Sequence, residues 1–257
     1  MSGPASNPVA AAFDAARDYE RHAHVQREIA ARLAADIGDL PLPPKPHVLE
    51  LGCGTGFLTR HVAARLPGAR FLATDIAPGM LERCRANLSG HPGLTFALLD
   101  ADSGTPPEPG HYDLICSSLA LQWSGDPAAA IRRTLGWLAP GGHLVLTSLL
   151  SGTFAEWRAA HVAEGLTPGL RTLPGREIFD AAEPDAQAGP HRVDTHHEVH
   201  ASGRAFLRAL RAIGAGTPDP GHRILGPGEM RRVLRRFDAG GASVSYEVIT
   251  CHYRREG

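Results

Sequence analysis

The chain has a single lysine, Lys45, so almost all of its positive charge is carried by arginine. Its 26 basic and 27 acidic residues leave a formal net charge of −1 over 257 residues. A chain so close to neutrality has no overall electrostatic attraction to nucleic acid or to an anionic membrane. We therefore expect neither of them as a partner.

Cysteine pairs, metal-binding patterns and long apolar runs are also absent from the sequence. The four cysteines include no CxxC pair, and His196–His197 has no HExxH-like spacing around it. A disulfide framework, a zinc site and any other metal site are therefore not expected. No apolar run approaches the roughly 20 residues that cross a bilayer, and the start has no basic end followed by an apolar core. These absences predict a cytoplasmic protein.

Strand-like and helix-like patterns alternate from about residue 47 to residue 150. Short apolar runs take turns with segments of helical periodicity, which is typical of a parallel sheet covered by helices on both faces. The sequence therefore predicts an α/β fold. Strands are expected at 47–51, 69–76, 94–102, 112–121 and 143–150, and helices at 57–66, 80–88 and 126–138.

The two ends of the chain depart from this rhythm. Apolar spacing predicts one helix over residues 19–37, and a proline-rich connector follows it. Late in the chain we expect helices at 203–215 and 228–237 and a closing strand at 242–255. We interpret the whole of 1–257 as one domain. Its expected parts are a helical cap and linker at 1–46, a cofactor-binding core at 47–150, and an insertion with C-terminal strands at 151–257.

Three glycines, Gly52, Gly54 and Gly56, follow the first predicted strand at alternate positions. Glycine allows a sharp turn and a close approach of a ligand to the backbone. The helix that starts next offers free N–H groups at its N-terminus. Any one of these glycines is compatible with a plain tight turn, but three in this spacing favour a nucleotide pocket.

The spacing G-x-G-x-G differs from the G-x-G-x-x-G that is typical of dinucleotide folds. Glu50 also lies in the strand, two residues before the first glycine. An acid there is unfavourable near a pyrophosphate and suits a ligand that carries an ammonium and a sulfonium. Asp75 ends the second predicted strand, and taken alone it is an ordinary residue for a strand end.

The run "LELGCGTG" at 49–56 resembles motif I of the class I S-adenosylmethionine-dependent methyltransferases. The resemblance implies a Rossmann-like, mostly parallel seven-stranded sheet with an antiparallel C-terminal strand, an N-terminal helical lid and a late helical insertion. It implies S-adenosylmethionine as cofactor and S-adenosylhomocysteine as product. Asp75 is expected to accept hydrogen bonds from both ribose hydroxyls. Asp100 is the expected acceptor for the adenine amino group, with Asp102 as the competing choice. Further cofactor contacts are implied for Ile76, Ala101 and Ser117.

Longer segments resemble a narrower family, the malonyl-[acyl-carrier protein] O-methyltransferases of bacterial biotin synthesis. They lie at 11–33, 112–127, 207–216 and 222–234. The resemblance implies methylation of the free carboxylate of a malonyl thioester on an acyl carrier protein or on coenzyme A. Methylation of another small acid or a secondary metabolite, and a scaffold that has lost catalysis, are the alternatives.

A carboxylate acceptor is already ionised near neutral pH, so no general base is expected. Tyr19 and Gln122 are predicted to position the reactants, and Gln26 lies seven residues beyond Tyr19 on the same predicted helix face. Arg171 and Trp123 are predicted to bind the substrate. A solvated loop arginine and a core tryptophan are the plain alternatives for these last two.

Arginines are dense near the C-terminus, where few acids accompany them. They are predicted to attract an acidic carrier protein, which would speed encounter more than it tightens binding. A solvated face, or pairing with acids around 180–185, is the alternative. The predicted docking residues are Arg204, Arg208, Arg211, Arg231, Arg232 and Arg235.

Overall fold

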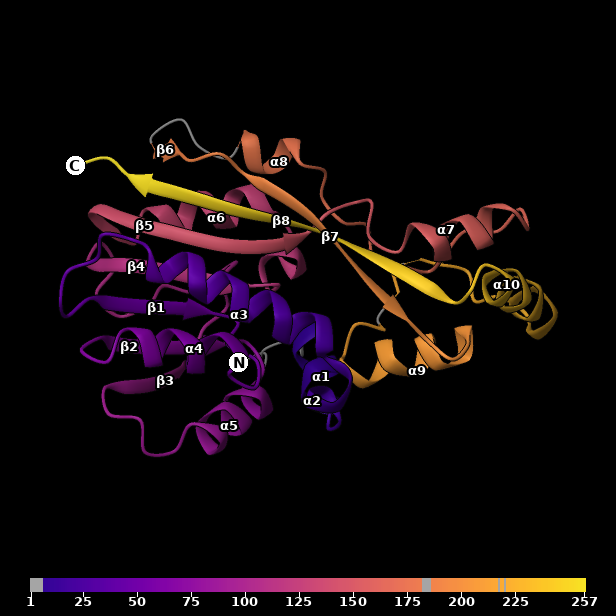
Figure 1. The fold of residues 1–257 in the computed structure, drawn as a ribbon, viewed down its shortest axis with the longest axis horizontal. Helices are drawn as coiled ribbons and strands as arrows, with labels where there is room; N and C mark the ends of the chain where they lie inside the picture. The colour runs from indigo at the N-terminus through magenta and orange to yellow at the C-terminus, as the bar shows by residue number, and fades with distance from the viewer. Residues whose placement is uncertain (1–6, 182–185, 217, 220) are drawn as a thin grey trace, which may run out of the picture.

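The computed structural model describes residues 7–181, 186–216, 218–219 and 221–257, and its centre is one twisted sheet (Figure 1). The strand order is β3-β2-β1-β4-β5-β8, and both β6 and β7 pair with β8. Because β6 and β7 pair with successive parts of β8, they share one place at the edge of the sheet. The strands are β1 (His47–Leu51), β2 (Arg70–Asp75), β3 (Leu94–Leu98), β4 (Tyr112–Ser118), β5 (Leu138–Leu149), β6 (Ala186–Ala188), β7 (Arg192–Val199) and β8 (Ser243–Arg255).

The first five strands are parallel, and β8 runs antiparallel to β5. The predicted mostly parallel sheet of seven strand positions with an antiparallel C-terminal strand is therefore confirmed. The central strand β1 is buried along Val48–Leu51 because helices cover both of its faces.

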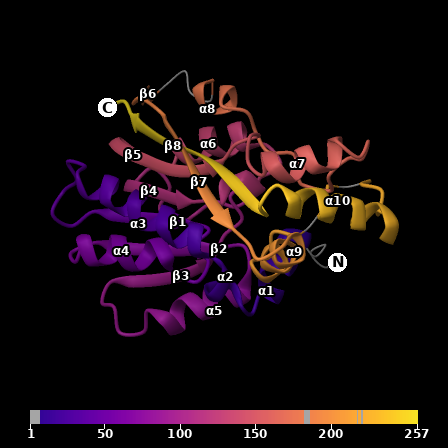
Figure 2. The same ribbon diagram turned by 45° about the vertical axis from the view of Figure 1, so that its right-hand side comes forward.

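Helices form a layer on each face of the sheet (Figures 1 and 2). Apolar residues of α3, α4 and α5 belong to one core cluster, and those of α6 and α8 belong to the cluster on the other face. The helices are α1 (Pro8–Ala15), α2 (Tyr19–His22), α3 (His24–Gly38), α4 (Phe57–Arg65), α5 (Pro78–Asn87), α6 (Pro127–Leu135), α7 (Ala155–Val162), α8 (Glu177–Asp180), α9 (Gly203–Ala212) and α10 (Pro227–Ala239), with a short 3-10 turn at Leu121–Trp123. In the described part of the chain, no helix has both the length and the apolar character needed to cross a bilayer.

The predicted helix over 19–37 is wrong at one point, because it is broken at Ala23. This residue is fully buried and has φ −91° and ψ 50°, so α2 ends there and α3 begins after it. Alanine favours helices, and only tertiary packing accounts for the break. The consequence is functional, since α2 turns away from α3 and carries Tyr19 toward the carboxyl ends of the strands.

The glycine-containing segment 140–142, which precedes the strand expected at 143–150, lies inside β5. Gly141 has φ +79°, and the pairing of β4 with β5 slips between Tyr112 and Leu114. The segment is therefore a bulge within one long strand. Positive φ at Gly141 explains why glycine is suited to this bulge.

β7 and β8 extend beyond the rest of the sheet toward a group of helices formed by α7, α9 and α10 (Figures 1 and 2). Aromatic rings join this group: Phe206 lies 5.3 Å from Trp157 and 5.6 Å from Phe237, measured between ring centroids. Helices α1 and α2 lie between this group and the sheet. The sequence predicted α9 and α10, but it did not predict α1, α7, α8 or β7.

Candidate active site

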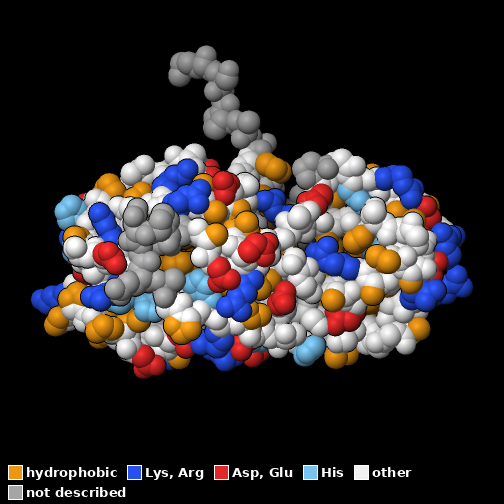
Figure 3. All heavy atoms as spheres, turned by 90° about the horizontal axis from the view of Figure 1, so that it is seen from above, with side chains coloured by type: hydrophobic (Ala, Val, Ile, Leu, Met, Phe, Trp, Pro, Cys, Tyr) orange, Lys and Arg blue, Asp and Glu red, His pale blue; other side chains and the backbone are white. Residues whose placement is uncertain are grey.

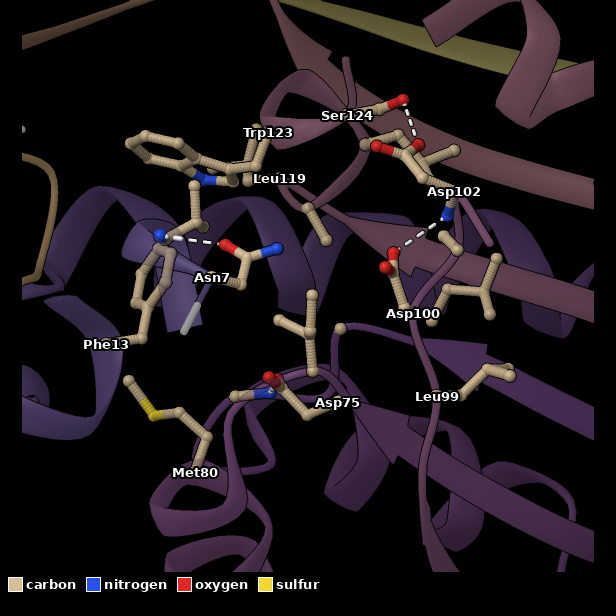
Figure 4. A pocket seen from close by; sticks show the side chains of 18 of the residues that line it. Asn7, Phe13, Asp75, Met80, Leu99, Asp100, Asp102, Leu119, Trp123 and Ser124 are labelled. Carbon is tan, nitrogen blue, oxygen red and sulfur yellow. Dashed lines mark hydrogen bonds between the residues drawn. The ribbon is translucent and has the colours of Figure 1, made fainter. Parts of the chain in front are cut away.

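A cavity of about 800 Å³ opens at the carboxyl ends of β1, β2, β3 and β4 (Figure 4). Ligands of open α/β sheets bind at this edge. Asp75, Asp100 and Asp102 lie along its strand side, and Phe13 and Asn7 of the N-terminal segment face them. Of the predicted cofactor residues, those in its wall are Gly52, Gly54, Asp75, Ile76, Asp100 and Ala101.

All three glycines of the loop have positive φ, and two of them, Gly52 and Gly54, line the cavity. Gly52 has φ +70°, and a Cβ there would clash with the Cβ of Ala120 in the segment after β4. Gly54 has φ +55°, and a Cβ there would meet no protein atom within 4 Å. The loop is thus packed tightly on one side and open to the cavity on the other, as a ligand that lies against the backbone requires.

Asp75 joins the ends of β1 and β2. Its Oδ2 accepts from the Gly54 N–H at 2.9 Å, and its Oδ1 accepts from the Ala77 N–H at 2.8 Å. Burial raises the pKa of this carboxyl, while these backbone donors act in the opposite direction. Each carboxylate oxygen has two acceptor positions, so both can still accept from a ligand hydroxyl.

Asp100 and Asp102 both line the cavity, and both hold the loop after β3 together. Asp100 Oδ1 accepts from the Asp102 N–H at 2.9 Å, and its Oδ2 accepts from Ser103 Oγ at 2.8 Å. Asp102 accepts from Ser124 Oγ and, at 2.9 Å, from the Gly125 N–H. Asp102 therefore ties this loop to the segment after β4, and the preference for Asp100 at the adenine stays a prediction.

Three predicted cofactor residues do not reach the described wall of this cavity. Ser117 is fully buried and donates to the Leu51 carbonyl at 2.9 Å, and its neighbour Ser118 lines the cavity instead, because successive strand residues point to opposite sides. Gly56 has φ +94° and packs against α5 next to Leu88. Glu50 lies behind the loop, so its predicted contact with the ligand is at most indirect.

Glu50 is the least compensated acid in this region. It is 1% exposed, and its Oε2 has no hydrogen-bond partner in the described structure. Burial is the largest cause that raises its pKa, to about 8, and hydrogen bonding to Thr59 opposes the shift only in part. An orphaned carboxyl behind the glycine loop is a group whose charge state responds to a nearby cation.

A second cavity of about 700 Å³ adjoins the first. Four residues, Phe13, Tyr19, Leu119 and Trp123, line both. Its polar groups come from six elements or loops, and none of its described lining residues is an acid. The polar lining residues are Tyr19, Gln26, Gln122, Trp123, Arg158, Arg171 and Tyr246.

Aromatic residues form the junction of the two cavities. The rings of Phe13 and Trp123 meet edge to face at 5.4 Å, and Tyr19 lies 5.9 Å from Phe57. Burial, followed by the charge of Asp75, raises the pKa of Tyr19, so its hydroxyl stays protonated near neutral pH. No described residue hydrogen-bonds this hydroxyl. Leu119, with φ +51°, is held at the junction by hydrogen bonds from its N–H to Thr147.

Tyr19 and Gln26 both line the second cavity, although the helix that was predicted to align them is broken. Gln122 is 4% exposed, and its Oε1 has no partner among the described residues. Arg171 donates from Nη2 to the carbonyls of Trp123 at 3.2 Å and Ser124 at 3.1 Å, and its guanidinium lies 5.7 Å from the Trp123 ring centroid. Arg171 is therefore a cavity residue and not a solvated loop residue.

Arg158 and Tyr246 are cavity residues that sequence reasoning missed. Arg158 lies on α7, and Tyr246 lies on β8 with its hydroxyl donating to Glu198 Oε2 at 3.0 Å. The alternating pattern of β8 indicates that Tyr246 is buried, yet nothing in the sequence connects it or α7 with this cavity.

The predicted docking arginines are all exposed on α9 and α10. Figure 3 shows arginine side chains gathered at the end of the molecule where α10 lies. Arg232 differs from the others, because its Nε lies 3.1 Å from Glu164 Oε2, and Arg236 binds the other oxygen at 2.9 Å. The remaining five form no ion pair with a described residue. The sequence suggested pairing with acids around 180–185 as an alternative role for these arginines, and residues 182–185 lie outside the described residues.

Comparisons with known proteins agree with this geometry. The family described as a methyltransferase domain matches residues 49–144. A putative methyltransferase from Bacillus halodurans has a similar structure, with a TM-score of 0.61 and 13% identity over 89% of this chain and 99% of that chain. The family match indicates a methyltransferase domain over residues 49–144, and the structural similarity shows the shared fold.

Two curated relatives narrow this class. The chain is 45% identical to a biotin biosynthesis bifunctional protein of Bordetella avium over 96% of this chain, but it spans only 52% of that protein. It is 39% identical to the malonyl-[acyl-carrier protein] O-methyltransferase of Magnetococcus marinus, over 95% of this chain and 90% of that protein. The chain belongs to the malonyl-[acyl-carrier protein] O-methyltransferase family, which confirms the resemblance of its motifs.

Proposed function

We propose that this protein transfers the methyl group of S-adenosylmethionine to the free carboxylate of malonyl-[acyl-carrier protein], a step of biotin synthesis. The observation that carries the proposal is the pair of joined cavities. One has the glycine loop and acidic residues that suit a nucleoside with a positive charge, and the other has arginines and no acid in its described wall. A cationic donor and an anionic acceptor can thus meet at Tyr19.

The first cavity fits S-adenosylmethionine. The open side of Gly54 leaves room against the backbone, Asp75 retains acceptor capacity for ribose hydroxyls, and Asp100 lies on the strand side for the adenine. The ligand supplies a methyl group that is bound to a sulfonium. An ionised carboxylate oxygen can accept this methyl group, and the acceptor has no proton to lose. Product release then involves S-adenosylhomocysteine and a methyl ester.

The chain's residues have three tasks in this reaction. Tyr19 at the junction and Gln122 in the second cavity orient the acceptor. The unpartnered Oε1 of Gln122 can accept a hydrogen bond from a ligand N–H, but not from the carboxylate, which has no proton to donate. Arg171 supplies positive charge toward the carboxylate. Phe13 and Trp123 close the junction and exclude water, which strengthens the electrostatic contacts inside it. No proton needs to be removed, so no base is required.

The acceptor's carrier is proposed to dock on the exposed arginines of α9 and α10. Acyl carrier protein is expected to be acidic, so the five arginines without an ion pair give a complementary surface. Malonyl-coenzyme A is the smaller alternative carrier. We place the reaction in the cytoplasm, where the four buried, unpaired cysteines stay reduced.

The test is an assay of purified protein with S-adenosylmethionine and malonyl carrier protein, malonyl-coenzyme A and a panel of free acids. We expect S-adenosylhomocysteine to form together with a methyl ester on the malonyl group, detected by mass spectrometry. If a free acid is methylated and neither malonyl thioester is, the proposed acceptor is wrong and that free acid takes its place. Absence of S-adenosylhomocysteine with every acceptor would overturn the proposed activity.

A further inference from the structure

The second cavity contains an arginine that is not in contact with any acid that the structure describes. Arg158 lies on α7 and is partly buried, and it forms no ion pair with any residue that the structure describes. Its Nε donates to the Thr153 carbonyl at 3.1 Å, which fixes the direction of the side chain. Burying a cation without a partner is costly, so such a group in a ligand cavity points to an anionic ligand.

The surroundings of Arg158 support this interpretation. Burial lowers its pKa, and among the described residues the charge of Asp219 opposes this shift. Asp219 forms no ion pair with the guanidinium, and its two oxygens accept hydrogen bonds from Thr172 at 2.8 to 3.1 Å, so its charge acts on Arg158 only from a distance. The rest of the wall is mainly apolar, from residues such as Phe154, Leu149 and Ile213.

The two arginines of the cavity differ in which of their guanidinium nitrogens already form hydrogen bonds. Arg171 uses Nη2 for two backbone carbonyls, so it holds the segment Trp123–Ser124 in place. Arg158 uses only Nε, so both of its terminal nitrogens remain without a partner among the described residues. Two parallel N–H groups from the terminal nitrogens can bind one carboxylate in a bidentate pair.

We propose that Arg158 binds the carboxylate of the methyl acceptor end-on and contributes more to its recognition than Arg171 does. This inference rests on the proposed function, since it assumes that the second cavity receives the acceptor. It assigns a role to α7, an element that the sequence did not predict. It also makes Arg158 the residue that distinguishes an acid from its neutral counterpart.

The experiment measures binding without turnover. The protein is saturated with S-adenosylhomocysteine, and calorimetry gives the Kd of a malonyl thioester of N-acetylcysteamine and of its carboxamide counterpart. In the wild type, the acid should bind at least about 10-fold more tightly than the amide. Arg158→Gln should reduce this ratio by about 10- to 100-fold, and Arg171→Gln should reduce it less.

Two variants separate recognition from folding. Arg158→Lys keeps the charge and should restore part of the ratio, whereas a purely structural role predicts the same ratio for Gln, Lys and wild type. Arg70→Gln is the matched control, because Arg70 is exposed at the far end of β2 and should leave the ratio unchanged. Melting temperatures of all variants show whether the fold is kept.

The outcomes distinguish the two proposals. A wild type that prefers the acid but does not methylate malonyl thioesters would reject the proposed function and keep the role of Arg158. An unchanged ratio in Arg158→Gln would overturn the inference even if the enzyme is active. A wild type that binds the acid no better than the amide, or not at all, would overturn it as well.

Discussion

The carboxylate of Asp75 accepts a hydrogen bond from the Gly54 N–H at 2.9 Å, which links the end of β2 to the glycine loop after β1. The other oxygen holds the Ala77 N–H before α5. One buried side chain therefore shapes two loops of the first cavity. The same side chain is placed to bind a ribose, so its structural and binding roles have to be separated by experiment.

We expect Asp75→Ala to weaken binding of S-adenosylhomocysteine strongly, by ~1.5–3 kcal/mol for each charge-assisted hydrogen bond that is lost. Asp75→Asn keeps one acceptor oxygen and should lose less. Calorimetry gives the affinities, and the melting temperature without ligand reports the structural role alone. Asp39→Asn, on the exposed end of α3, is the control. Binding of NAD in place of S-adenosylmethionine would contradict the assignment of the cavity.

Glu50 makes the stability of the ligand-free protein depend on pH. Burial raises its pKa from an ordinary value near 4.5 to about 8. The stability is therefore complete below about pH 4.5 and is lost as pH rises through 8, by up to about 5 kcal/mol. The difference in unfolding free energy between wild type and Glu50→Gln should show this loss, since the histidines titrate in both proteins and cancel. A flat difference curve would mean that Glu50 is ionised already at low pH.

Binding of a cationic ligand should also release a proton from Glu50. At pH 7 the side chain is mostly protonated, and a nearby positive charge lowers its pKa. We expect release of up to about one proton per bound S-adenosylmethionine. The heat of binding should then differ between buffers of different ionisation enthalpy, and Glu50→Gln should abolish the difference. No proton release in the wild type would place Glu50 outside the field of the ligand.

Tyr19 is expected to act on turnover more than on cofactor affinity, because its ring lines both cavities and its hydroxyl has no partner in the described structure. Tyr19→Phe should lower kcat by about 10-fold or more, as expected for a lost hydrogen bond to an aligned reactant. The Kd of S-adenosylhomocysteine should change little. An unchanged kcat would leave Tyr19 with a packing role only.

The sequence predicted the parts of the fold whose pattern is local. Glycines after an apolar strand and an acid at the end of the next strand already indicate the first cavity, because the carboxyl ends of parallel strands meet at one edge. β7 was missed because it lies at the sheet edge, where partly buried and exposed residues alternate without an apolar stripe. Neither face of such a strand has the row of apolar residues by which a strand is predicted from sequence.

The second cavity was predictable only in part. Gln122 and Trp123 lie in a short turn a few residues after β4, so their place at the mouth of the sheet is set by local sequence. Arg158 reaches the same cavity from α7, and its position depends on how α7 packs against β8 and α10. The break at Ala23 is of the same kind, since packing overrides the helix preference of alanine there. Contacts between distant segments decide these features.

Docking of an acidic carrier protein should depend on ionic strength. If the carrier binds the arginines of α9 and α10, association is assisted by long-range attraction. The kcat/KM for malonyl carrier protein should then fall steeply as ionic strength rises past about 0.1 M, where the screening length is ~10 Å. A small malonyl thioester should respond far less, because its carboxylate is held inside the second cavity.

Charge reversal identifies the docking residues. Arg208 and Arg231 are exposed and have no ion pair with a described residue, so Arg208→Glu with Arg231→Glu should lower kcat/KM for the carrier substrate by about 10-fold. The small thioester should be spared. Arg232 is bound to Glu164, so Arg232→Gln should have a smaller effect on association, and Arg70→Glu at the far end of β2 should have none. Equal losses for both substrates would show that the arginines support the fold or the active site. Unchanged rates for both would show a solvated face, and the carrier would then have to dock on another surface.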